Sequence, residues 1–209
     1  AEDKPFKFEK VLKLGLDKDV FKPENITLEK QIKNWFTMPY EVDEDGFYNT
    51  KGSVDLTKWK GEQLPIKFGT VEGNFDCRGV GLKTLEGCPR VVGKNFVCVE
   101  NNLISFEFCP DQVGSFFGSR NKVKKIDDLP TIEHDLYLVG CELSSLKGCP
   151  KTIRGTFEVS LNYLESLEGG PQVVHGNYKA LNNDIDSLKG FPKKVGGDFN
   201  LQGNKFTSI

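Results

Sequence analysis

Two stretches of the sequence, FEVSLNYLESL at 157–167 and FNLQGNKFTSI at 199–209, share one pattern of apolar and polar residues. In both, apolar residues stand at the first, third, eighth and eleventh positions, and an asparagine stands at the sixth. Alternation at the start is the period of a half-buried strand. A buried asparagine can hydrogen-bond backbone groups of a neighbouring coil where the chain leaves the strand. Each stretch therefore predicts one strand and one turn of a repeating unit.

The same pattern recurs from residue 54 to the end of the sequence. A Gly-Cys-Pro triplet or a variant follows the eleventh position in most copies and stops strand pairing. One such unit cannot bury its apolar side alone, so the units must stack on one another. We therefore expect a mainly β solenoid over 54–209, with a parallel strand in each coil and non-helical returns. A looser copy of the pattern begins at Val54. The first positions of the later copies are Phe75, Phe96, Phe117, Leu136, Phe157, Tyr178 and Phe199. Their spacings are 21, 21, 19, 21, 21 and 21 residues.

Several short motifs resemble a known family. Leu64–Gly69, Gly73–Cys77 and Leu85–Pro89 are similar to the repeats of short leucine-rich repeat proteins, which occur in many bacteriophage genomes and some bacterial ones. Glu44–Gly46 and Val54–Leu56 resemble the entry segment of that family. The resemblance covers roughly residues 40–209 and implies a leucine-rich repeat solenoid of seven repeats and one partial repeat. No common function is known for the family, so the resemblance implies a phage source rather than a mechanism.

Two segments precede the repeats. Residues 23–53 are predicted to form a cap, which a solenoid needs because its first coil otherwise exposes apolar surface. The cap comprises a helix over Asn25–Phe36, started by Asn25 or Thr27, and a hairpin that turns at Asp45-Gly46. Residues 1–22 mix charged and large apolar residues, and we expect an arm that orders on a partner.

Composition excludes several classes of partner. The 209 residues carry a formal charge of −2, so no electrostatic footprint for nucleic acid or an anionic membrane is present. No apolar run approaches the ~20 residues that cross a bilayer. The six cysteines form no Cys-x-x-Cys pair, and we expect them to be small core residues of a protein made in a reducing compartment. Stacking of the coils brings Cys88 near Cys109, so a disulfide between these two on exposure to air is the alternative. We expect no nucleic acid, no membrane, and a location in the virion or the host bacterial cytoplasm.

No arrangement of residues predicts an active site. His134 and His175 have no partnered nucleophile and are expected to be solvated loop residues. The acidic run Glu41–Gly46 imitates a calcium loop, but the twelfth-position glutamate would fall on Gly52, which favours a hairpin turn. A cluster of lysines is expected to be a solvated edge: Lys122, Lys124 and Lys125. We therefore expect no catalytic residue, no metal and no cofactor, and the chain is not expected to be an enzyme.

The outward positions of the strands predict a first contact surface. The second and fourth positions of each repeat point away from the core, and several carry apolar side chains. Such a mixed apolar patch is typical of an interface, and ordinary β-propensity on a solvated sheet is the alternative. The residues are Val97, Val99, Arg120, Tyr137, Val139 and Leu181.

The broken spacing at Phe117 predicts a second surface. Phe108 stands where most repeats have glycine, and Phe116 stands where most have Asn, Asp or Thr. Two outward aromatic residues would need a cover, so we expect a contact site there. Packing of both rings inside their own coil would make the break a structural irregularity only.

The last coil predicts a third surface. Its apolar side chains have no following coil in the sequence, and we expect them to abut another protein or another copy unless the sequence is a fragment. These residues are Phe199, Leu201, Phe206 and Ile209.

These observations favour a non-enzymatic protein-binding or structural module. The first interpretation is a phage-encoded virion component of the capsid or tail. The alternative is an intracellular phage or bacterial effector that binds and inhibits a host protein. Both would use the strand-lined face, the N-terminal arm or the C-terminal end.

Overall fold

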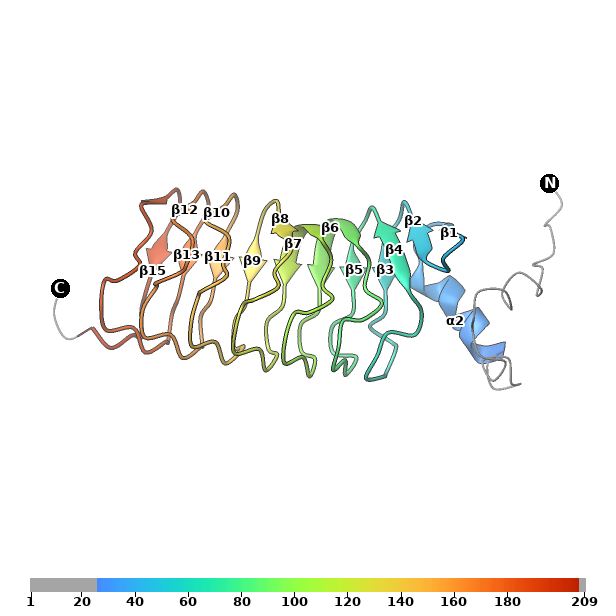
Figure 1. Cartoon of the computed structure of the whole chain (residues 1–209), viewed down its shortest axis with the longest axis horizontal. Coiled ribbons are helices and arrows are strands. Elements are labelled where there is room, and N and C mark those ends of the chain that lie inside the picture. Colours follow the sequence, from blue (N-terminus) through green and yellow to red (C-terminus); the bar gives the residue numbers. More distant parts are fainter. Residues whose placement is uncertain (1–25, 207–209) are drawn as a thin grey trace.

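The protein is a β-solenoid whose coils stack along one long axis (Figure 1). The computed structural model describes residues 26–206, and the predicted arm at 1–22 therefore lies outside the described residues. Helix α2 (Ile26–Trp35) lies at one end of the stack and β15 (Phe199–Asn200) lies at the other. The predicted mainly β solenoid, with a small N-terminal helix and a hairpin, is confirmed.

The strands lie in two rows along the stack. The main row follows the first and second repeat positions and contains β3, β5, the end of β6, the end of β7, β9, β11, β13 and β15. The second row contains β1, β2, β4, the starts of β6 and β7, and β8, and a separate sheet, β10-β12-β14, continues it. All pairings are parallel except that of β1 with β2. The remaining bounds are β1 Tyr40–Val42, β2 Tyr48–Thr50, β3 Val54–Asp55, β4 Phe68–Val71, β5 Phe75–Asp76, β6 Val91–Val97, β7 Gln112–Phe117, β8 Thr131–Ile132, β9 Leu136–Tyr137, β10 Thr152–Ile153, β11 Phe157–Glu158, β12 Val173–Val174, β13 Tyr178–Lys179 and β14 Lys194–Val195.

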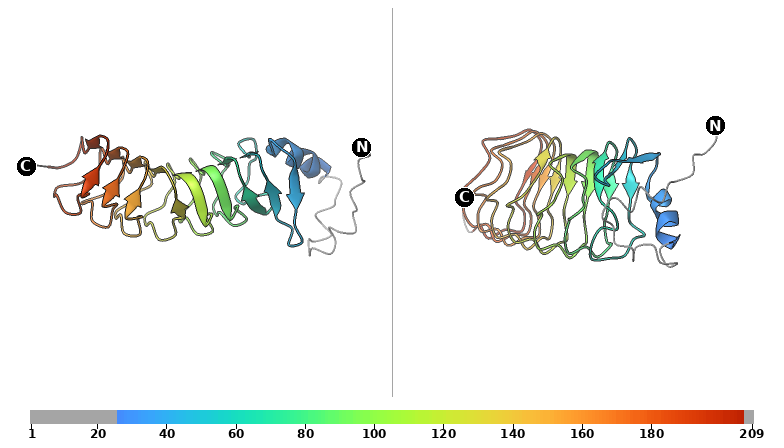
Figure 2. Two further views of the ribbon diagram at one scale, coloured as in Figure 1. Left: turned by 90° about the horizontal axis from the view of Figure 1, so that it is seen from above. Right: turned by 45° about the vertical axis from the view of Figure 1, so that its right-hand side comes forward.

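Helix α2 and the β1–β2 hairpin close the first coil, and both views of Figure 2 show them at the same end. The buried Trp35 of α2 meets Trp59 edge to face, with 5.9 Å between ring centroids. In the hairpin turn, Asp43 Oδ1 accepts hydrogen bonds from the backbone N–H groups of Asp45 and Phe47 at 3.1 and 2.9 Å. The acidic run is therefore a hairpin turn, as the sequence predicts.

In five coils, an asparagine at the sixth position ties the coil to the previous one. Asn162 is 5% exposed, and its Nδ2 donates to the carbonyl oxygens of Leu138 and Val159 at 2.8 and 2.9 Å. Its Oδ1 accepts from the backbone N–H groups of Cys141 and Leu143. Backbone groups that leave the strands are thereby satisfied in the interior, where an unpaired group is costly. The same role falls to Asn101, Asn121, Asn183 and, at the end, Asn204.

The predicted frame is wrong in one coil. The parallel register pairs Phe96 with Phe116 and Phe116 with Leu136, so this coil begins at Phe116 rather than Phe117. The spacings on either side are therefore 20 and 20 residues instead of 21 and 19. Phe116 is 0% exposed, and its ring packs against that of Phe96 at 5.5 Å. Phe117 consequently takes the outward second position.

A glycine accommodates the new frame. Gly118 occupies the third position, where other coils carry Cys, Leu, Val or Ala. A Cβ atom on Gly118 would lie 2.7 Å from ring atoms of both Phe106 and Phe116. Phe106 is the eleventh residue of the preceding coil, where most coils have leucine, and its larger ring fills the space that Gly118 leaves. The two departures from the repeat are therefore complementary in volume.

Candidate protein-binding surface

The outward residues of the main row change character along the stack. At the second position, Val97, Phe117 and Tyr137 occupy three adjacent coils in the middle. The coil before them carries Asp76, and the coil after them carries Glu158. The row is therefore apolar at its centre and charged on both sides.

The centre of the row is a contiguous apolar surface. The rings of Phe117 and Tyr137 stack with centroids 4.9 Å apart and planes 8° apart. Each of the five side chains is partly exposed, so this surface is available to a partner. We call this set the central patch: Val97, Val99, Phe117, Tyr137 and Val139.

Leu181 lies apart from the central patch. It occupies the fourth position two coils beyond Val139, and the buried Ser160 separates the two. Ser119 lies between Val99 and Val139 in the same way and accepts the backbone N–H of Val139 at 3.0 Å. Leu181 differs because the second position of its own coil is Lys179, whereas Val97 and Tyr137 hold that position beside Val99 and Val139. The structure therefore brings four of the predicted apolar residues together and leaves the fifth outside.

Arg120 borders the patch but is paired. It stands at the fifth position with φ +57°, not at the outward fourth position that the original frame gave it. Its guanidinium Nη1 donates to Glu100 of the previous coil. Flanking charges are likewise paired, Arg78 with Asp76 at 2.6 Å and Lys179 with Glu158 at 3.7 Å. Such exposed pairs contribute little stability, but they leave the borders of the patch polar and compensated.

The two aromatic residues of the second predicted surface differ in their exposure to solvent. Phe116 is buried in the core, so its assignment as a contact residue is wrong. Phe108 is 56% exposed and holds a left-handed backbone with φ +63°. The equivalent residues Gly87, Gly148 and Gly169 also have positive φ, which explains why the position favours glycine.

The predicted C-terminal contact surface is partly exposed. Phe199 is 38% exposed and packs edge to face on Tyr178 and Phe191, at 5.3 and 5.1 Å. Leu201 and Phe206 are half-buried, and Ile209 lies outside the described residues. The contact predicted for this end stays a prediction.

The cysteines have the environment of core residues. All six are thiols in the structure, and all but Cys109 are buried. Burial raises the pKa of the Cys109 and Cys149 thiols to about 12 and that of Cys141 to about 11. Because the thiolate is the reactive form, these groups are poor nucleophiles and metal ligands near neutral pH.

Two pockets lie away from the central patch. One of about 650 Å³ is lined by Trp35 and Trp59 with polar side chains of α2 and the first coil. The other, of about 440 Å³, is lined by Ile104, the three lysines of the predicted solvated edge, and the carboxylates of Asp127, Asp128 and Glu142.

Within residues 26–206, no group of three His, Cys, Asp or Glu side chains is placed to hold a metal ion. The one helix in this range is too short to span a bilayer.

Sequence reasoning missed Phe117 as a surface residue because it was assigned to the core. The signal that corrects the frame is the asparagine, which follows the first position by five residues in Asn101 and Asn162. Asn121 stands five residues after Phe116, not after Phe117.

No protein-family model, curated protein or solved structure matches this chain.

Proposed function

We propose that this chain is a non-enzymatic protein-binding module that holds another protein on the central patch. The observation that carries the proposal is the Phe117–Tyr137 stack, flanked by Val97, Val99 and Val139 on one regular row. Aromatic side chains offer large contact area at low entropic cost and are enriched in interface centres. A polar rim around an apolar centre is the usual composition of such an interface.

The rigid row supports this use. Every coil is hydrogen-bonded to its neighbours, so the outward side chains keep fixed spacings of about 4.8 Å along the stack. A partner can therefore bind without first ordering the surface, which reduces the entropic cost of association. The resemblance to phage-encoded repeat proteins suggests where the partner comes from, and we propose that it is a protein of a phage particle.

Capture on the immobilised protein tests the proposal. We expect Val97→Asp combined with Tyr137→Ala to abolish retention of a protein that the wild type retains from an infected-cell extract or from dissociated phage particles. A matched control, Asp76→Ala combined with Lys179→Ala, changes the same row outside the patch and should retain the protein. Equal capture by both double variants, with unchanged thermal unfolding, would exclude the central patch. Recovery of the chain in purified particles, rather than only in the lysate, separates a virion component from an effector.

A further inference from the structure

Charges of opposite sign gather at the two ends of the second row. The separate sheet β10-β12-β14 lies towards the β15 end, and the β1–β2 hairpin lies at the α2 end of the same edge (Figure 1). We call the first cluster the basic end: Lys151, Arg154, Lys193 and Lys194. We call the second cluster the acidic end: Glu41, Asp43, Glu44 and Asp45.

The basic end is an uncompensated cluster. The register aligns Thr152, Val173 and Lys194 on adjacent strands, so its four cations lie within about 10 Å along the stack. The crossing segments 150–157, 171–178 and 192–199 contain one carboxylate, that of Asp198, which forms no ion pair with a described residue. All four side chains are exposed, and none lies within 4.0 Å of a carboxylate of the described residues. On the neighbouring coil, the carboxylate of Glu133 already accepts a hydrogen bond from Gln112 at 2.7 Å.

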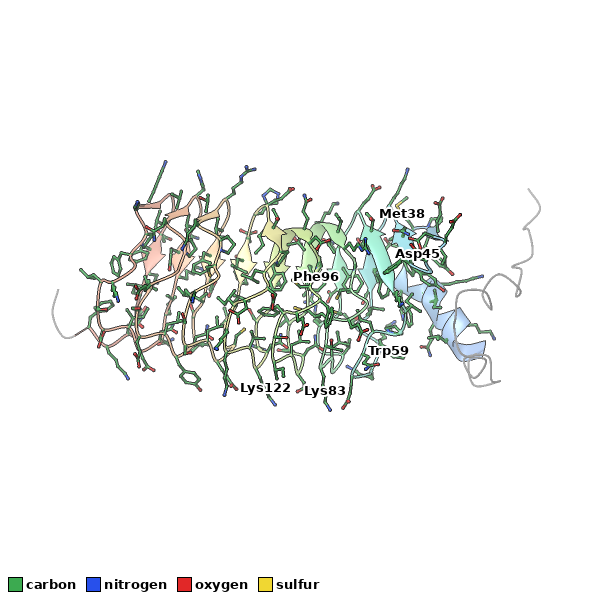
Figure 3. All side chains as sticks on the ribbon, in the orientation of Figure 1. Met38, Asp45, Trp59, Lys83, Phe96 and Lys122 are labelled. Atoms are coloured by element: carbon green, nitrogen blue, oxygen red, sulfur yellow. The ribbon has the colours of Figure 1, made fainter. Side chains whose placement is uncertain are left out.

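The acidic end presents carboxylates that are similarly available. Asp43 is occupied by the hairpin turn, where it accepts bonds from two backbone N–H groups and from Asn49 Nδ2. Glu41, Glu44 and Asp45 are exposed and form no ion pair with a described residue. Asp45 lies at the hairpin end of the molecule in Figure 3. Two cations, Lys67 and Arg90, lie over the ring of Phe47 at 5.9 and 5.6 Å beside the turn. The three carboxylates on the hairpin nevertheless face solvent without an ion pair, opposite in sign to the cluster at the far end of the row.

We propose that two copies of this chain associate side by side and antiparallel, each placing its acidic end on the basic end of the other. A two-fold axis across the second row makes both contacts at once, because the distance between the two ends is the same in each copy. The contact is isologous and closed, which is the commonest form of oligomer. Complementary potentials of this kind fix the register and orientation of the partner.

A second copy fits the basic end better than a nucleic acid does. The outward residues between the cations are Thr152, Gln172, Val173 and His175, so a single imidazole is the only ring there that could stack on a base, and no Phe, Tyr or Trp is present. The whole chain carries a charge of −2, which opposes the approach of a long polyanion. The chain itself carries the complementary acidic cluster at the opposite end of the second row, where an antiparallel second copy would bring it onto the basic end.

Charge reversal and rescue test the proposal. At about 20 mM salt, where exposed charges are weakly screened, we expect light scattering to show a particle of twice the 23.4 kDa of the chain. Arg154→Glu with Lys193→Glu and Lys194→Glu should weaken association at least about tenfold, as should Glu41→Lys with Glu44→Lys and Asp45→Lys. Asp43 is kept in all variants because it holds the turn.

The two triple variants should associate with one another when mixed, because each then offers the end that the other lacks. A variant with all six reversals should again form a homodimer. The matched control, Lys122→Glu with Lys124→Glu and Lys125→Glu, makes the same change in net charge at the opposite edge, where Lys122 lies in Figure 3, and should dimerise as the wild type does. A wild type that stays monomeric at low salt overturns the proposal, whether or not immobilised heparin retains it, as does a six-fold variant that fails to associate.

Discussion

The coils that begin at Leu136, Phe157 and Tyr178 follow one pattern, whereas the two that begin at Phe96 and Phe116 depart from it. In the regular coils, the first position of a coil follows the buried residue of the second row by four in residue number, as Phe157 follows Ile153. Phe116 follows Val113 by only three. The two rows therefore merge into the continuous strand β7, and β6 follows it with a register shift between Val92 and Asn95.

The difference teaches that the irregularity supplies one member of the contact surface, Phe117. The missing residue moves Phe117 from the core frame to the outward position, where its ring meets that of Tyr137. Regular coils carry Glu158 and Lys179 at the same outward position and pair them with one another. The residue missing from this corner thus adds the ring of Phe117 to an outward row that already carries Val97 and Tyr137.

The largest effect should come from Gly148 in a regular coil. Its φ of +98° lies outside the left-handed region of other residues, and a Cβ atom would overlap the carbonyl oxygen of Ile126. We expect Gly148→Ala to lower the free energy of unfolding by more than about 4 kcal/mol, measured by urea denaturation. The control is Gly140→Ala, with φ +63° and an ordinary contact of 3.9 Å from the added Cβ atom to the carbonyl oxygen of Leu161, which should cost only about 1 kcal/mol. Equal costs for the two substitutions would contradict this explanation.

The asparagine ladder should show no difference between the two regions. The Nδ2 groups of Asn121 in the irregular region and Asn162 in the regular one donate to equivalent buried carbonyl oxygens. Oδ1 accepts from one backbone N–H group in Asn121 and from two in Asn162. We expect Asn121→Ala and Asn162→Ala each to cost about 3 kcal/mol, because several interior groups lose their partners. Urea denaturation measures both. A cost for Asn121→Ala below about 1 kcal/mol would show that the irregularity extends into the turns.

The complementary pair in the irregular region should couple. Gly118→Ala alone brings a methyl group against Phe106 and Phe116, and we expect a loss of about 2 kcal/mol. Phe106→Leu alone leaves a void and should cost about 1–2 kcal/mol. The double variant reproduces the Leu167–Ala180 combination of a regular coil and should cost less than the sum by at least about 1 kcal/mol. Additive costs in this double-mutant cycle would mean that the two residues do not share a space.

The sequence predicts the solenoid because its signals are local and repeated. The alternation at Phe157–Val159 recurs along the repeats, and the asparagine of Asn162 recurs in five of the coils, so that each copy of the pattern defines a strand and a turn. The position of Phe116 was mispredicted because two adjacent phenylalanines satisfy the same apolar pattern, and only stacking on Phe96 chooses between them. The partnership of Gly118 and Phe106 joins residues of different coils, so a pattern within one coil cannot show it.

The smallest effect should come from Phe108, the exposed aromatic residue in the irregular region. Its φ of +63° costs about 1–2 kcal/mol for a residue with a Cβ atom, and its side chain is 56% exposed. Glycine removes that strain but gains freedom in the unfolded chain, so we expect Phe108→Gly to stabilise by about 0.5–1 kcal/mol. The melting temperature should rise by about 2–3 °C.

Phe108→Ala separates strain from contact, since it keeps the strained backbone and removes only the ring. It should not stabilise the protein. If Phe108→Gly instead lowers the melting temperature, the ring supports its own coil, and the exposed side chain belongs to the packing of the irregular region. If it raises the melting temperature, the fold retains a strained aromatic residue that it does not need for stability. Strain of that kind is retained where a side chain serves a contact outside the fold, which would join Phe108 to the binding surfaces of this protein.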